Sequence, residues 1–290
     1  MEPILKPLKE DLLSLYNENY IAKARKLNQD IATDRKSNQD FIAENYEPMY
    51  FTGKFDAKTV FVMLNPGSKK EENYSFKSDT NGKIKYKDFD SFFQSHKKKH
   101  INYGFDDKDR PDNFDIKQAA FLYNFKDSGL ELPNFMQDKD KKTMLMAKEI
   151  VLMNKLQLEL VPYVSVDFRG IFDNKTLALK HIDFFVSHIN RILDAITFYD
   201  RKYVFFGAKQ FYYLLQAYKE KGYGQLEFGK ENSCKIDGLE RKVYFNTVKI
   251  THNGKQINAG IPYSFPRRDL PNAYKKMSDY GKFCFEEFNF

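Results

Sequence analysis

The sequence predicts an α/β fold with a central, mainly parallel sheet, and two observations support this class. Short, continuously apolar runs end abruptly at Pro or Gly, which is typical of strands buried on both faces of a sheet. Amphipathic helical patterns lie between these runs, so strands and helices alternate along the chain. Such alternation favours parallel strands joined by right-handed crossovers.

The first elements are a helical extension and a strand. Residues 1–50 contain leucines and tyrosines at approximately helical spacing, and we expect this extension to pack outside the main fold. An apolar run at 60–64 then stops at Asn65-Pro66-Gly67, which predicts a buried strand ending in a loop.

The middle of the chain begins with an insertion. Residues 69–112 are rich in Lys, Asp, Asn and Ser and lack a hydrophobic period, which predicts a charged, loop-rich segment that includes Lys97 to Lys99. Helical patterns follow at 116–125 and 144–152, and the second leads into a strand candidate, LQLELVPY, at 156–163.

Residues 176–197 form the clearest helical pattern, because an apolar side chain recurs every three or four positions. A strand is predicted at 203–207, and a helix at 208–218 follows it. Strand, helix, strand and helix therefore succeed one another in this part of the chain.

The C-terminal region predicts a hairpin and a final helix. Asn253-Gly254 separates two apolar-patterned runs, which is a strong hairpin signal, and the second run ends at Pro262. An aromatic-rich helix is expected at 273–288. Because neither an internal repeat nor a Pro/Ser/Gly linker divides the chain, we expect a single domain over residues 1–290.

Composition excludes several classes of protein. The 28 Phe and 19 Tyr supply enough apolar surface for a globular core. Two cysteines, Cys234 and Cys284, are too few for a disulfide framework or a cysteine-rich metal site, and neither lies in a CxxC spacing. The N-terminus lacks the apolar run of a signal peptide, and no stretch reaches the roughly 20 apolar residues of a membrane span. We therefore expect a monomeric cytoplasmic protein with neither a membrane nor a metal partner.

The net charge of +7 and the pI near 9.0 suit a phosphate-bearing partner such as DNA. An A·T-rich coding sequence would produce the same excess of Lys. The charge alone therefore does not distinguish a DNA-binding protein from a bias in composition. Dinucleotide, P-loop, zincin and hydrolase-elbow motifs are all missing from the sequence, and we expect no cofactor.

Polar segments follow three of the predicted strands. They are Asn65 to Ser68, Pro162 to Ser165, and residues 262–272. Ligands of open parallel sheets bind outside the carboxyl ends of the strands. We therefore expect Asn65, Tyr163 and the 262–272 loop to meet in one pocket.

The segment TVFVMLNPGS, at 59–68, resembles the first active-site motif of the uracil-DNA glycosylase superfamily, particularly its mismatch-type branch. Three later segments resemble family segments in the expected order: LELVPYVS at 158–165, YVFFGAKQF at 203–211 and IPYSFPRRDLPNAY at 261–274. The resemblance implies a three-layer α/β/α fold. It also implies a monofunctional DNA glycosylase that flips a modified, deaminated or mismatched pyrimidine and hydrolyses its N-glycosidic bond.

The resemblance assigns roles to individual residues. Asn65 would position the attacking water, with Pro66, Gly67 and Ser68 beside the substrate. Members of the family carry a histidine in the second motif, whereas this chain has Ser264-Phe265-Pro266-Arg267-Arg268. The group that stabilises the departing base is therefore unassigned.

Further candidates follow from the residues themselves. Glu159 interrupts an apolar strand, so it either reads the base or assists the water, or it points to solvent from an edge strand. Tyr74 or Phe76 is a candidate for stacking on the flipped base, with an ordinary core or surface role as the alternative. Tyr163 and Ser165 either contact the base edge or simply follow the end of the strand.

The 262–272 loop is the candidate DNA-binding element. Arg267 and Arg268 would contact phosphates, or else remain solvated on the surface. Leu270 is the candidate wedge between bases, and Ser264 and Asn272 flank it. Two other functions stay open: a catalytically silent nucleic-acid-binding protein on the same scaffold, and a nucleotide- or nucleoside-processing α/β enzyme.

Overall fold

The computed structural model describes most of the chain. The described residues are 4–16, 26, 28–29, 48–64, 86–102, 113–126, 128, 130–135, 141–163, 172–265 and 274–288.

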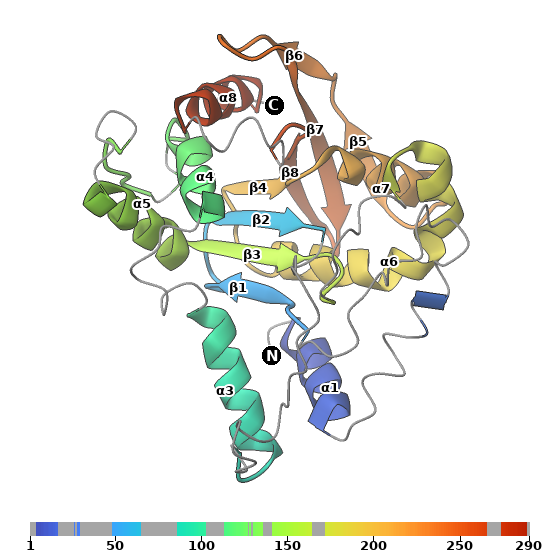
Figure 1. Cartoon of the computed structure of the whole chain (residues 1–290). Helices are drawn as coiled ribbons and strands as arrows, with labels where there is room; N and C mark the ends of the chain where they lie inside the picture. Colours follow the sequence, from blue (N-terminus) through green and yellow to red (C-terminus); the bar gives the residue numbers. More distant parts are fainter. Residues whose placement is uncertain are drawn as a thin grey trace.

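An eight-stranded mixed sheet forms the centre of the molecule (Figure 1). Its strand order is β1 (Phe51–Gly53), β3 (Lys155–Glu159), β2 (Thr59–Met63), β4 (Tyr203–Phe206), β8 (Lys255–Pro262), β7 (Val243–His252) and β5 (Gln225–Phe228), with β6 (Asn232–Cys234) also paired to β7. The four strands β3, β2, β4 and β8 run parallel, whereas β1 and β7 are antiparallel to their neighbours. The predicted α/β class with a mainly parallel centre is confirmed.

Helices pack on both faces of this sheet. One face is covered by α4 (Asn113–Leu122), α5 (Lys141–Asn154) and α8 (Tyr274–Glu287). The other is covered by α1 (Leu5–Tyr16), α6 (Lys175–Phe198) and α7 (Lys209–Glu220). A further helix, α3 (Phe89–Ile101), extends from the β1 side of the sheet (Figure 1).

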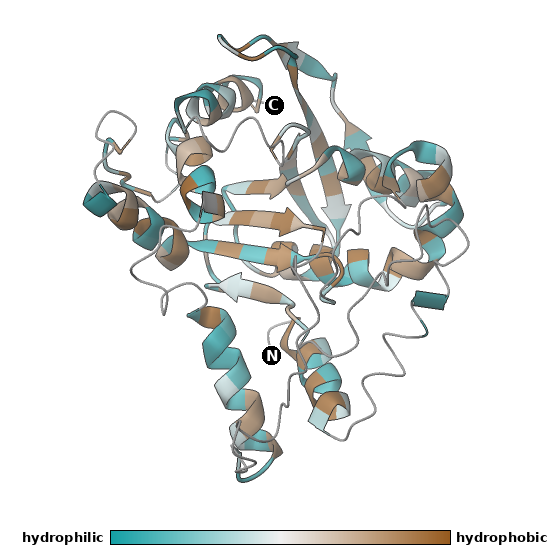
Figure 2. Cartoon of the chain, viewed as in Figure 1, coloured by the Kyte–Doolittle hydropathy of each residue, from teal (hydrophilic) through white to brown (hydrophobic). Residues whose placement is uncertain are grey.

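Successive side chains of the buried strands point to opposite faces of the sheet, so the interior is divided into two hydrophobic cores. In β2, Val60 and Val62 belong to the core beneath α6, while Phe61 belongs to the core beneath α4 and α8. Successive side chains of a strand point to opposite faces, so a strand covered by helices on both sides must be apolar throughout. Figure 2 shows this hydrophobic character along the central strands.

The C-terminal hairpin has the predicted turn. Asn253 and Gly254 have φ values of 51° and 74°, the left-handed conformation that a two-residue hairpin turn requires. The β8 strand then pairs parallel with β4 and ends at Pro262, as predicted.

Two expectations about the N-terminal half are wrong. The insertion contains α3, which begins with a capping box between Asp88 and Ser91, so Lys97 to Lys99 lie in a helix. The helix α1 does not pack outside the main fold, because Leu8 and Leu12 are fully buried in the core of the sheet. Sequence patterns also missed the short strands β1, β5 and β6.

Candidate functional site

The carboxyl ends of the parallel strands lie together at one edge of the sheet. Leu160 donates its backbone N–H to the Met63 carbonyl at 2.8 Å, and Gly207 donates to the Val62 carbonyl at 2.9 Å. The end of β2 is thus enclosed by the ends of β3 and β4. Asn65 follows this point by two residues and lies outside the described part of the chain.

This edge contains the topological switch point of the sheet. The chain passes from β2 to β3 on one side, and then returns to β4 on the other side of β2. Crossovers that leave in opposite directions open a crevice between β2 and β4, where ligands of doubly wound sheets bind. β2, the strand that precedes Asn65 in the sequence, ends at this switch point.

Glu159 is the buried carboxyl group at the site. It lies at the end of β3, paired in register with Met63 of β2, and only 2% of its surface is exposed. Because β3 lies between β1 and β2, the alternative of a solvent-facing group on an edge strand is wrong.

The two carboxyl oxygens of Glu159 have different surroundings. Oε1 accepts a hydrogen bond from Gln157 Nε2 at 2.7 Å, whereas buried Oε2 has no partner among the described residues. Burial raises the pKa of Glu159 to about 8, although the Gln157 hydrogen bond and the charges of Lys155 and Arg191 oppose the shift. This shift favours the protonated, neutral form of Glu159 at neutral pH.

Tyr163 belongs to a second buried network, on the opposite face of β3. Its hydroxyl donates to Asp11 Oδ2 at 3.1 Å, and Tyr50 donates to the same oxygen at 2.5 Å. Arg191 stacks over the Tyr50 ring and donates to the backbone carbonyls of Glu159 and Leu160 at 2.7 and 2.6 Å. These contacts attach α1 and α6 to the end of β3, and a contact from Tyr163 to a base stays a prediction.

Ser264 is buried just beyond the end of β8. Its backbone N–H donates to the Tyr280 hydroxyl at 3.2 Å, and that hydroxyl donates to the Tyr244 carbonyl at 2.5 Å. The next residue, Phe265, is buried 5.6 Å from Phe61, measured between ring centroids. The predicted DNA-binding loop therefore starts at the same sheet edge as the loop after β2.

The other predicted site residues lie outside the described part of the chain. They are Asn65, Pro66, Gly67, Ser68, Tyr74, Phe76, Ser165, Arg267, Arg268, Leu270 and Asn272.

A cationic groove of about 1150 Å³ lies beside Ser264. It is lined by Lys209, Glu231, Gly238, Leu239, Glu240, Arg241, Lys242, Tyr244, Tyr263, Ser264 and Lys276. Four of these side chains are cationic and two are acidic, so the lining carries a positive balance. Lys209 begins α7, whose N-cap residue Ala208 offers no side-chain hydrogen bond. The positive end of the α7 helix dipole adds to the attraction for an anion.

Sequence patterns did not predict this groove. Its cations come from three separate segments, at the start of α7, before β7 and in α8. The sequence shows Arg241-Lys242 and Lys275-Lys276 as adjacent cations, but it does not show that they lie beside Lys209.

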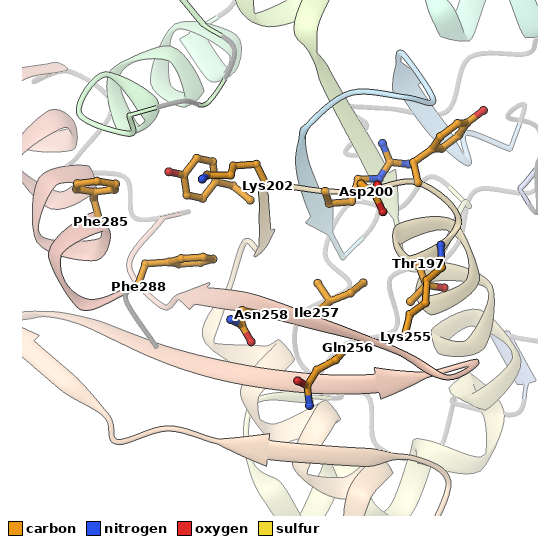
Figure 3. Close-up of a pocket in the computed structure, with 12 residues that line it drawn as sticks. Thr197, Asp200, Lys202, Lys255, Gln256, Ile257, Asn258, Phe285 and Phe288 are labelled. Atoms are coloured by element: carbon orange, nitrogen blue, oxygen red, sulfur yellow. The ribbon is translucent and has the colours of Figure 1, made fainter.

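A second hollow, of about 490 Å³, lies at the opposite, amino edge of the sheet (Figure 3). Lys202, before β4, and Lys255, at the start of β8, contribute to its wall. Arg201 at this hollow donates to the Ala57 and Ala195 carbonyls, which fixes the end of α6. The predicted motif segments leave the sheet from the other edge, so this hollow is separate from the candidate site.

Two further observations concern metal sites and membrane spans in the described part of the chain. Among the described residues, no group of three or more His, Cys, Asp or Glu side chains could hold a metal ion. None of the described helices is long and apolar enough to cross a membrane.

Comparisons with known proteins add no relative: no family model, no curated protein and no solved structure matches the chain.

Proposed function

We propose that this protein is a DNA glycosylase with a uracil-DNA glycosylase-like fold, acting on a modified, deaminated or mismatched pyrimidine. The observation that carries the proposal is Glu159, a buried carboxyl group with one unpartnered oxygen at the carboxyl end of β3. Buried groups with strongly shifted pKa values concentrate at functional sites. The Asn-Pro-Gly segment that resembles the family motif begins two residues after the neighbouring strand end.

The proposed reaction hydrolyses the bond between the base and the sugar. Water adds to the sugar carbon as the N-glycosidic bond breaks, and the bonding electrons leave with the base. The proton that the water loses neutralises the departed base anion. The Asn65 amide would orient this water, and a hydrogen-bond donor at the departing base would stabilise its developing negative charge. None of these steps requires a metal or a cofactor.

The cationic groove supports DNA as the partner. It borders Ser264, from which the chain continues into Arg267 and Arg268. Phosphate contacts of this kind hold a duplex in register while the target nucleotide is extruded.

A base-release assay tests the proposal. Oligonucleotides carrying modified, deaminated or mismatched pyrimidines are incubated with the wild type, and abasic sites are revealed by alkaline cleavage. Asn65→Ala should keep the fold and the DNA affinity, yet lower the single-turnover rate by at least about a hundredfold. A small loss of rate in a folded variant would contradict the role given to Asn65.

The cationic groove also favours a second candidate, a catalytically silent nucleic-acid-binding protein. Binding through Lys209 and Arg241 needs neither Asn65 nor Glu159. Tight DNA binding by the wild type without release of any base in the panel would favour this candidate over the glycosylase.

A further inference from the structure

A chain of hydrogen-bonded side chains reaches Glu159 from the other end of β3. Lys155, Gln157 and Glu159 alternate along the strand, so their side chains project from the same face. Two residues of α4, Asp115 and Gln118, cover that face and complete the chain.

Each hydrogen bond in this series of side chains has a defined donor and acceptor. Lys155 Nζ donates to Asp115 Oδ1 at 2.7 Å and also to Gln118 Oε1. Gln118 Nε2 donates to Gln157 Oε1 at 3.0 Å, and Gln157 Nε2 donates to Glu159 Oε1 at 2.7 Å.

Lys155 fixes the donor-to-acceptor direction of all the hydrogen bonds that lead to Glu159. A lysine ammonium only donates hydrogen bonds, so Gln118 must turn its carbonyl oxygen toward Lys155 and its amide nitrogen toward Gln157. Gln157 must then turn its own nitrogen toward Glu159. Oε1 of Glu159 is consequently an acceptor, and the carboxyl proton belongs on Oε2, the oxygen with no partner among the described residues.

We propose that Lys155, Gln118 and Gln157 are positioning residues that hold the Glu159 proton on Oε2, so that this carboxyl group serves as an O–H donor at the candidate site. The choice of the flipped base as its acceptor rests on the proposed function. The direction of the hydrogen bonds and the position of the proton do not.

The charged groups around Glu159 come from several elements. Lys155 on β3 and Arg191 on α6 both favour the ionised carboxyl group, and burial outweighs them. Asp115 on α4 pairs with Lys155, and Lys117 and Lys148 are the other buried charges on the helices covering this face. A test must therefore separate hydrogen-bond direction from a change in nearby charge.

The decisive variant is Gln118→Met, which does not alter a residue in contact with Glu159 and leaves the formal charge unchanged. Without Gln118, Gln157 can rotate and accept the Glu159 proton itself, which stabilises the neutral acid. The ionisation midpoint of Glu159, measured by NMR on the full chain with carboxyl-¹³C glutamate, should rise by at least about one unit from about 8. The resonance is assigned by its loss in Glu159→Gln.

Two variants serve as controls for this shift. Lys155→Arg keeps a cationic donor, and the midpoint should stay within about half a unit of the wild-type value. Gln210→Met removes a half-buried glutamine of α7 that donates to Asp173 Oδ1 and takes no part in the hydrogen bonds leading to Glu159, so it should leave the midpoint unchanged. An unchanged midpoint in folded Gln118→Met would overturn the proposal.

A measurement on the wild type keeps the proposal falsifiable if Gln118→Met fails to fold. Because the hydrogen bonds are linked, the side-chain amide ¹⁵N resonances of Gln118 and Gln157 should titrate with the midpoint of Glu159. Amide resonances that ignore the Glu159 titration would contradict the linkage.

Base release supplies a separate readout. Folded Gln118→Met should lose at least about tenfold in single-turnover rate at pH 7 while its DNA affinity stays unchanged. If the wild type releases no base, the proposed function fails, and the NMR measurements still decide the position of the proton.

Discussion

Two buried carboxyl groups, Asp11 and Glu159, lie on opposite faces of the sheet near the end of β3. Asp11 accepts hydrogen bonds from Tyr50 and Tyr163 through one oxygen and joins α1 to the sheet. Glu159 accepts one hydrogen bond, from Gln157, and its buried Oε2 has no described partner. Buried polar atoms are usually paired. On the proposed function, Oε2 of Glu159 is the oxygen available to a ligand, whereas Asp11 holds the fold together.

The strongest expected contrast is in the pH dependence of stability. Glu159 has a pKa of about 8 in the folded chain against an ordinary value of 4.5, so the folded state binds an extra proton between these two pH values. Stability should therefore fall as pH rises through this window, by up to about 5 kcal/mol relative to Glu159→Gln. Urea unfolding of both proteins across this window measures the difference, and parallel stability curves would show that Glu159 ionises normally.

Removing the other carboxyl group should damage the fold instead. Asp11→Ala leaves the hydroxyls of Tyr50 and Tyr163 without this acceptor and removes a buried negative charge near Arg191. We expect a loss of about 3 to 4 kcal/mol in the free energy of unfolding. Base release per folded molecule should stay near the wild-type rate, and a specific loss of activity would place Asp11 in the site.

The groove at the carboxyl edge and the hollow at the amino edge of the sheet allow a smaller test, which asks whether DNA binds at the edge that carries the candidate site. Arg241→Ala removes a cation from the groove at the carboxyl edge and should lower the salt slope of DNA binding by about one. Lys202→Ala changes the hollow at the amino edge and should leave the slope unaltered. Equal effects of the two substitutions on the salt slope would contradict DNA binding at the carboxyl edge of the sheet.

Sequence reasoning found the elements with strong periodicity. The recurrence of apolar residues every three or four positions in α6 and the Asn253-Gly254 turn are local signals. Both elements form as predicted. The β1 strand was missed because three residues cannot display a period. The helix α3 was missed because charged residues obscure the buried stripe that includes Phe92 and His96.

The candidate site was only partly accessible to such reasoning. A charged residue in an apolar strand identified Glu159, and the parallel order of the strands brings its strand end beside that of β2. The partners of Glu159 could not be predicted, because Gln118 lies 39 residues before Gln157 on a helix whose placement depends on tertiary packing. The cationic groove was missed for the same reason.

The most direct test of Glu159 as a neutral donor is the single-turnover rate of base release against pH for the wild type, Glu159→Gln and Glu159→Met. The wild-type rate should fall as pH rises through 8, where the Oε2 proton is lost. Glu159→Gln places an N–H donor at the same position, so it should stay within about tenfold of the wild type and lose this pH dependence, whereas Glu159→Met should be at least about a hundredfold slower. A wild-type rate that rises through pH 8, with Glu159→Gln as slow as Glu159→Met, would contradict the donor role and assign Glu159 to the activation of water as a carboxylate.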